Sequence, residues 1–367
     1  MAANNRIFYA TQAVALKGQN STGTVSSNWF YPRGLQSVGI TTNFGLEQVF
    51  QLGQIELYDN VENVPEVEVT MSKVIDGTVS LYSLCMCGND APSTVSGKEL
   101  VALANNRVNF RLGIYNDTQS AATGTPSVHV DCSGMYLSSV SYTIPVEGNA
   151  TEDVTLVGNN KVWNSGLLGA PSVNGAFGGQ TDSGQQTAPA IARRFKYNAT
   201  DSLIPTGLGG GMPIPEGKTR PQIQSITVST TLGREAIFEL GAMAPYHRYV
   251  TFPLEVTSEF QIIASSGDYV EANDFSATVS SCAATYRNLQ DKAIKVVICG
   301  SGAGDSYAID LGSKNKLTSV NYTGGDTGGG NATVTYSYQT FNKFITISSG
   351  TFAVTTYNDN TDSGVGD

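Results

Sequence analysis

The sequence repeats one of its own segments after 188 residues. The segment from Leu35 to Gly53 reads LQSVGITTNFGLEQVFQLG, and the segment from Ile223 to Gly241 reads IQSITVSTTLGREAIFELG. Eight of the 19 ungapped positions are identical, whereas unrelated windows share about one or two. The identical pairs are Gln36/Gln224, Ser37/Ser225, Thr42/Thr230, Gly45/Gly233, Glu47/Glu235, Phe50/Phe238, Leu52/Leu240 and Gly53/Gly241. We therefore predict an internal duplication.

The length of the chain agrees with two folded units. At 367 residues it exceeds what one ordinary hydrophobic core organises and is about right for two domains. Residues 165–190 are rich in Gly, Gln and Ser and almost uncharged, which is typical of a connector. We predict a first domain at 1–164, this linker, and a second domain at 191–367.

Two acidic segments alternate in the manner of half-buried strands. Near the start of the first, Val67, Val69 and Met71 alternate with Glu66 and Glu68, and a period of two puts apolar and acidic side chains on opposite faces. The second has Leu254, Val256 and Ser258 alternating with Glu255, Thr257 and Glu259. The offset between the two segments slips by one residue, which predicts a bulge or a loop difference.

The composition is that of a sheet protein with many turns, because only 14% of residues are charged and there are 40 glycines. We expect about seven or eight strands and one short flanking helix per unit, in a barrel or sandwich. The expected strands include 5–11, 37–44, 48–58, 107–115, 137–143, 152–163, 292–299, 317–323 and 331–341, and the expected helices are 96–106 and 282–290.

Charge and cysteine content narrow the class further. The formal net charge is -10 and no basic run occurs, so a surface that grips nucleic-acid phosphates is not expected. The five cysteines are an odd number and favour reduced, mostly buried thiols in a protein assembled in a cytosol. We find neither a secretory signal nor a stretch of about 20 apolar residues, so no membrane partner is expected.

Catalytic and metal-binding patterns are weak throughout the sequence. Only His129 and His247 could serve a Ser/His/Asp triad, and no GxSxG elbow accompanies them. In the run HVDC, His129 and Asp131 share a strand face while Cys132 points away, which favours a partly exposed strand histidine over a metal ligand. The pair Cys85 and Cys87 lacks a second pair at zinc spacing and is interpreted as part of a strand. No enzyme activity, metal or cofactor is expected.

Paired carboxylates are the remaining enzymatic pattern. Glu66 with Glu68, or Glu255 with Glu259, has the chemistry of a glycosidase acid and base, but no cluster of Trp or Tyr lies near them in the sequence. Solvated or lumen-facing charge is the preferred interpretation. The glycine runs at 209–211 and 328–330 match no phosphate-binding loop.

The motif NVPEVEVTMSKVIDG at 63–77, a half-acidic strand leading to an Asp-Gly turn, resembles the tail tube proteins of tailed bacteriophages, as does the strand, helix, strand order around it. This resemblance concerns element order and composition in both halves. It implies a virion structural protein, assembled in the bacterial cytoplasm, whose rings stack into a hollow tail tube through which the genome leaves. Glu66, Glu68, Glu255 and Glu259 are then the candidate lumen-lining residues, which repel DNA so that it passes without binding.

The same resemblance implies partners. Tube rings of this family usually hold six barrel-type domains, so two domains per chain predict a pseudo-sixfold trimer, with a hexamer as the alternative. The tape-measure protein, and further sheath, tail terminator or baseplate proteins, are implied as neighbours. A capsid-decorating or fibre protein and a carbohydrate-binding adhesin are the alternative functions, since both are also Gly/Ser/Thr-rich β proteins without chemistry.

Overall fold

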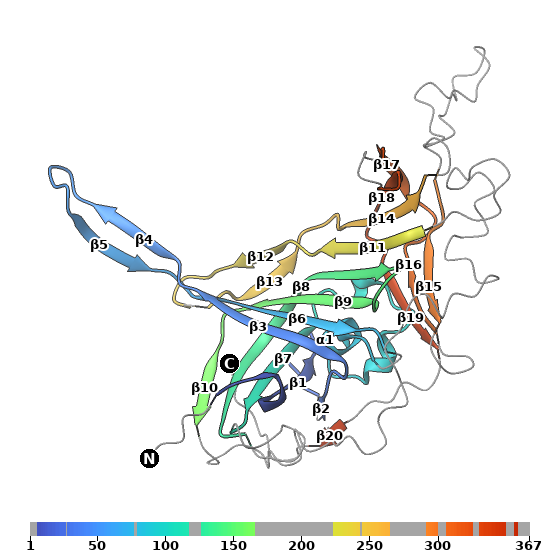
Figure 1. Ribbon diagram of the computed structural model, residues 1–367. Coiled ribbons are helices and arrows are strands. Elements are labelled where there is room, and N and C mark those ends of the chain that lie inside the picture. Colours follow the sequence, from blue (N-terminus) through green and yellow to red (C-terminus); the bar gives the residue numbers. More distant parts are fainter. Residues whose placement is uncertain are drawn as a thin grey trace.

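The computed structural model describes most of both halves of the chain. The described residues are 6–26, 28–76, 79–116, 126–165, 223–242, 244–264, 291–299, 306–325, 330–349 and 356–358. The protein is mainly β, as predicted, and its strands pair antiparallel (Figure 1). The described strands form open sheets and no closed barrel, so the barrel alternative is wrong for the single chain.

The first half contains ten strands and the described helices. Its helical segments are η1 (Tyr9–Thr11), α1 (Leu81–Met86), η2 (Pro92–Val95) and α2 (Leu100–Leu103). Its strands are β1 (Gln12–Gln19), β2 (Asn28–Phe30), β3 (Leu35–Asn43), β4 (Leu46–Phe50), β5 (Leu57–Glu62), β6 (Glu66–Val74), β7 (Arg107–Ile114), β8 (Val128–Pro145), β9 (Thr151–Gly158) and β10 (Val162–Ser165).

The described part of the second half consists of strands. They are β11 (Ile223–Thr231), β12 (Arg234–Ile237), β13 (His247–Val250), β14 (Glu255–Ile263), β15 (Lys295–Cys299), β16 (Ser306–Asp310), β17 (Lys316–Thr323), β18 (Thr333–Phe341), β19 (Ile345–Ser349) and β20 (Thr356–Asn358). Strand β20 pairs with β2 of the first half.

One continuous sheet joins the two halves. Its strands lie in the order β3, β6, β9, β8, β11, β14, β18, β17, and the contact between the halves is the pairing of β8 with β11. Figure 1 shows β3, β6, β9, β8 and β11 across the middle of the molecule, with β14, β18 and β17 at the upper right. Strands β3 and β17 are therefore the two ends of this row.

The two sets of four strands have the same pairing order and the same register. Strand β3 pairs with β6 as β11 pairs with β14, and each pairing shifts register once, between Leu35 and Ser37 and between Ile223 and Ser225. The pairing of β8 with β9 shifts between Leu137 and Ser139, and that of β17 with β18 shifts between Leu317 and Ser319. The β6–β9 and β14–β18 pairings have no shift.

A second layer covers the apolar face of this sheet. The long strand β8 also pairs with β7 and β10, and β7 continues through β1 to β2. In the second half, β16 pairs with β15 and β19 in a separate three-stranded sheet. Buried side chains from both halves and from α1 belong to one hydrophobic cluster, so the described parts of the halves share a core. The predicted boundaries at 164 and 190 stay predictions, because 166–222 lies outside the described residues.

The alternating strands were predicted correctly. Val67, Val69 and Met71 are at most 2% exposed, as are Leu254 and Val256. The one-residue slip comes from the loop before each acidic strand, because three residues separate β5 from β6 and four separate β13 from β14.

Several local predictions were wrong. Residues 5–11 were expected to be a strand, but the Thr11 hydroxyl accepts from the Phe8 N–H and donates to its carbonyl, which closes a 3-10 turn. The CxC pair lies in and just after helix α1, whose N-terminus is capped by the Ser80 hydroxyl. Of the helix expected at 96–106, only α2 is helical; the helix expected at 282–290 lies outside the described residues.

Candidate functional site

The face of the eight-stranded row that points away from the core is polar. It consists of the alternate residues of each strand, mostly Ser, Thr, Asn and Gln. Examples are the cross-strand pairs Thr227 with Thr143 and Ser229 with Ser141 at the junction of the halves. Among Lys and Arg residues the eight strands contain only Lys73 and Lys316, and Lys73 is buried in the core.

All four predicted lining residues lie on this polar face. Glu66 and Glu68 lie opposite Asn43 and Thr41 of β3. In the second half, Glu255 and Glu259 are exposed, and Glu259 lies opposite Thr227. The structure therefore places the four carboxylates on one face of one sheet.

The four carboxylates are not equivalent. Glu66 forms an ion pair of 3.0 Å with Arg248, a residue of β13 that is itself buried. No such ion pair involves Glu68, Glu255 or Glu259 among the interactions described. Glu66 thus joins the two halves, whereas the other three supply negative charge to the face.

Sequence reasoning missed a fifth carboxylate on this face. Asp153 of β9 is exposed and lies between Ser72 of β6 and Ser141 of β8. The alternation at 151–158 could have indicated its position, because Glu152, Val154 and Leu156 are buried and Asp153 is not. The adjacent acidic pair hid this pattern, because Glu152 faces the core.

The two end strands carry partly exposed apolar side chains. Val38 and Ile40 of β3 and Val320 of β17 are partly buried against the core, and Tyr322 of β17 is 49% exposed. Their counterparts in the inner strands β11 and β8 are buried, because each of those strands has a neighbour on both sides. These counterparts are Ile226, Val228, Val140 and Tyr142, and none is more than 1% exposed.

In each half the repeated segment forms one strand of the main sheet, then the first strand and the turn of a hairpin. Strands β4 and β5 form the first hairpin and β12 and β13 the second, and Val49 pairs with Asp59 as Ile237 pairs with His247. Gly53 and Gly241, at the two turns, have φ of 89° and 91°, a conformation that favours glycine. The positive φ explains why glycine occurs at this position in both turns.

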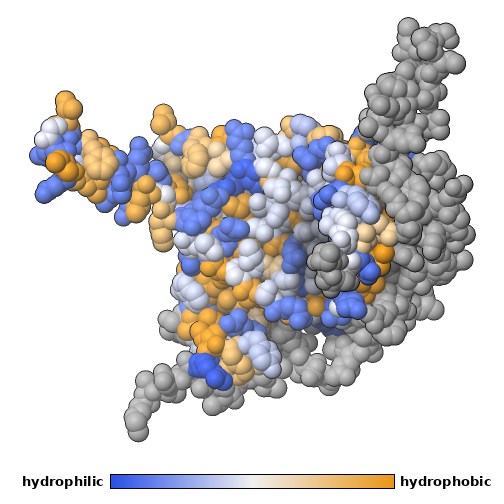
Figure 2. Space-filling model, turned by 45° about the horizontal axis from the view of Figure 1, so that its top comes forward, coloured by the Kyte–Doolittle hydropathy of each residue, from blue (hydrophilic) through white to orange (hydrophobic). Residues whose placement is uncertain are grey.

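The β4–β5 hairpin projects beyond the ends of β3 and β6 (Figure 1). Figure 2 shows apolar and polar side chains mixed along this projection. Both hairpins expose large apolar side chains, and Leu52 and Leu240 near their tips are fully exposed. Predicting a single strand at 48–58 was wrong, because the chain turns between Phe50 and Leu57.

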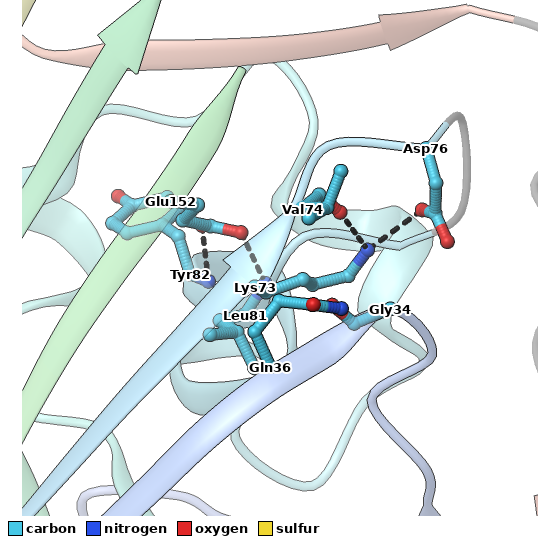
Figure 3. Close-up of polar contacts among 8 residues, drawn as sticks. All are labelled: Gly34, Gln36, Lys73, Val74, Asp76, Leu81, Tyr82 and Glu152. Atoms are coloured by element: carbon cyan, nitrogen blue, oxygen red, sulfur yellow. Dashed lines mark hydrogen bonds and ion pairs between the residues drawn. The ribbon is translucent and has the colours of Figure 1, made fainter. Parts of the chain in front are cut away.

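A buried carboxylate ties helix α1 to the main sheet. Glu152 accepts hydrogen bonds from the backbone N–H groups of Leu81 and Tyr82, at 2.7 and 2.8 Å (Figure 3). It also accepts from the Tyr142 hydroxyl at 2.8 Å, and that hydroxyl contacts the hydroxyl of Tyr307 in β16 at 2.7 Å. Burial raises the pKa of Glu152, although the hydrogen bonds and the nearby Lys73 act in the opposite direction. The network connects both halves through the core.

Replacing Glu152 with Gln is expected to lower the free energy of unfolding by about 2 kcal/mol at pH 5, because one buried acceptor becomes a donor facing an N–H or O–H group. A carboxyl whose pKa is raised by folding contributes fully below its unfolded pKa and loses that contribution as pH rises through its folded pKa. The difference between wild type and variant should therefore shrink as pH rises. Denaturant titrations at several pH values measure it, with the exposed Asp153→Asn as the control; a difference that grows with pH would contradict this assignment.

The residues tested for chemistry are scattered. His129 is buried, not partly exposed as predicted, and lies 3.5 Å from Asp131, which also binds Arg111. Cys85, Cys87 and Cys132 are free and buried, and burial raises the pKa of all three thiols, that of Cys87 and of Cys132 to about 12. Within the described residues, no group of His, Cys, Asp and Glu side chains could hold a metal ion.

Among the described helices, none has the length and apolar character needed to cross a membrane. No family model matches the chain, and no curated protein matches it.

Proposed function

We propose that this chain is a structural protein whose copies join edge to edge into rings, and that the rings stack into the hollow tail tube of a bacteriophage. The observation that carries the proposal is the junction of β8 with β11. In it, the last strand of one four-stranded set pairs with the first strand of an equivalent set. The proposal includes the internal duplication, since the two sets then descend from one tube-type unit.

The two end strands of the row, β3 and β17, are the counterparts of the two strands that pair at the internal junction. Strand β3 occupies in the first set the place of β11, and β17 occupies in the second set the place of β8. A second copy can therefore pair its β3 with β17 in the way that β11 pairs with β8. Such a head-to-tail contact repeats around a closed ring and removes both open edges.

The internal junction also supplies the register between copies. Val228 lies opposite Tyr142 in the chain. Their counterparts are Ile40 and Tyr322, so Ile40 of one copy lies opposite Tyr322 of the next. Both side chains are partly exposed in the single chain and become buried in the proposed contact, which gives it a hydrophobic contribution.

The polar face suits the interior of such a ring. It is rich in hydroxyl and amide groups and carries Glu68, Asp153, Glu255 and Glu259 with little positive charge. A like-charged lining repels DNA phosphates, so that DNA slides through rather than binds. The hairpins continue along the strands while ring closure runs across them, so their tips point toward the next ring of a stack.

The purified protein is expected to form rings or hollow filaments in electron micrographs. Three copies supply six four-stranded sets, so views down the ring axis should have threefold symmetry with a pseudo-sixfold outline. A ring of six chains would retain the tube and overturn the trimer. Persistently monomeric or solid fibrous material would overturn the function itself.

One observation favours the carbohydrate-binding alternative. The first hairpin and its base expose Phe44, Phe50 and Tyr58, and exposed aromatic rings are typical of sugar-binding surfaces. They alternate with exposed aliphatic residues and form no described cleft. Retention on immobilised glycans by the monomeric protein, lost on replacing these three residues with Ala, would support an adhesin and count against a tube.

A further inference from the structure

The second hairpin lies against the first half of its own chain. His247 Nδ1 is 2.8 Å from the Tyr136 hydroxyl, and the two rings meet edge to face. Burial, and then the charges of Arg107 and Arg234, lower the pKa of His247, which favours the neutral ring in this hydrogen bond at neutral pH. This contact fixes how a hairpin lies on the neighbouring four-stranded set.

Arginines complete the same contact. Arg248 donates to Glu66 at 3.0 Å and to Asn159. Arg234 donates to the backbone carbonyls of Leu137 and Ala104, at 2.7 and 2.8 Å. The hairpin that follows β11 thus reaches over the middle of β8 and the neighbouring ends of β9 and β6 in the set beside it.

Each of the four residue pairs of β12 and β13 has an equivalent pair in β4 and β5, so each contact residue of the second hairpin has a counterpart in the first. Asp59 pairs with Val49 as His247 pairs with Ile237, which makes Asp59 the counterpart of His247. Lys316 pairs with Gln339 just before the register shift of β17, as Tyr136 pairs with Val157 before that of β8. Lys316 is therefore the counterpart of Tyr136.

We propose that the β4–β5 hairpin of one copy lies across the end of β17 of the next copy, with the Asp59 carboxylate bound to the Lys316 ammonium. This inference rests on the proposed ring, and adds to it the residues that determine which edges join. Asp59 and Lys316 carry opposite charges at neutral pH. The residues that they replace, His247 and Tyr136 of the internal contact, are uncharged there. Asp59 is exposed on its hairpin.

Lys316 lies at the start of β17, where a second copy can reach its side chain. Its Nζ lies 2.9 Å from Asp291, and both side chains are about half exposed. Because the Lys316 side chain is about half exposed, the carboxylate of a second copy can approach the ammonium from solvent. Like charges brought together at an interface oppose association, and opposite charges fix its register.

The two contacts differ in chemistry, which gives the assembly direction. The internal contact uses Arg234 and Arg248, whose counterparts on the first hairpin are Leu46 and Asn60. The first hairpin therefore lacks both arginines of the internal contact, the one that binds Glu66 and Asn159 and the one that binds backbone carbonyls. Its Asp59 meets a lysine only on the second set. The β4–β5 hairpin of one copy therefore fits the second four-stranded set of the next copy, so copies join head to tail.

The charge exchange tests the pairing. Asp59→Lys and Lys316→Asp are each expected to raise the protein concentration needed for half assembly at least about threefold at low salt, because each brings like charges together. The double variant Asp59→Lys/Lys316→Asp restores the opposite charges and is expected to recover most of the loss. Sedimentation velocity over a concentration series, at about 50 mM and 500 mM salt, measures both effects.

Asp90→Lys, at an exposed site elsewhere in the first half, is the matched control for total charge. Combined with Lys316→Asp, it should not restore assembly. A double Asp59/Lys316 variant that assembles no better than the weaker single variant overturns the pairing while the rings of the wild type still support the proposed function. Failure of the wild type to form rings under any condition overturns both.

Discussion

Replacing Ile40 with Lys is expected to leave the chain folded and monomeric. Ile40 lies on the end strand β3, where it is partly exposed, so the single chain tolerates a long polar side chain there. In the proposed ring the same position lies opposite Tyr322 and becomes as buried as Val228 is in the internal junction. The variant therefore separates folding from assembly.

The expected loss of association follows from burying an unpaired charge. Desolvating an ammonium with no partner costs several kcal/mol, and about 3 kcal/mol already raises the concentration needed for association more than about a hundredfold. Sedimentation velocity should show a single-chain species at concentrations where the wild type forms rings. Circular dichroism and the thermal midpoint should stay close to those of the wild type.

Thr41→Lys is the matched control, because Thr41 is the next residue on the same strand and is exposed on the polar face. It adds the same charge without burying it in the contact and should still assemble. If Ile40→Lys forms rings as readily as Thr41→Lys, β3 is not the assembling edge.

The main elements of the sheet could be predicted from the sequence because their faces differ. In β6 and β14, alternation between apolar and acidic residues specified both the strand and the side that meets the core. The sequence repeat aligns β3 with β11. These two strands pair with β6 and β14 in the same register.

Features that depend on tertiary contacts could not be predicted. Helix α1 is buried on all sides, so its residues show no helical alternation, and the Ser80 cap is a single hydroxyl. The role of Glu152 depends on N–H groups about 70 residues away, and a sequence window contains no sign of them. The pairing of β8 with β11 across the two halves was likewise invisible, although it supplies the main argument for assembly.

If the polar face lines the proposed tube, reversing its charge is expected to make the tube hold DNA. The residues to change are Glu68, Asp153 and Glu259, because they lie on this face and no described ion pair involves them, unlike Glu66. Each replacement by Lys changes the local charge by two units. Assembled tubes of this triple variant should retain DNA, whereas wild-type tubes should not.

Salt dependence distinguishes this retention from other causes. If lysines contact phosphates, the logarithm of the binding constant should fall with the logarithm of salt concentration, by about 0.9 for each phosphate neutralised. In a phage that carries the variant, infectivity should fall at least about tenfold, because each contact with a phosphate opposes sliding. Tail length and particle yield should be unchanged, since these side chains face away from the core.

The neutral variant Glu68→Gln/Asp153→Asn/Glu259→Gln separates repulsion from attraction. Gln and Asn keep the size and hydrogen bonding of the original side chains, so this variant should assemble normally and hold DNA far more weakly than the lysine variant. If loss of repulsion alone slows passage, infectivity should fall by an intermediate amount. Normal infectivity and no DNA retention in the lysine variant would place this face outside the channel, even if rings form by the β3–β17 contact.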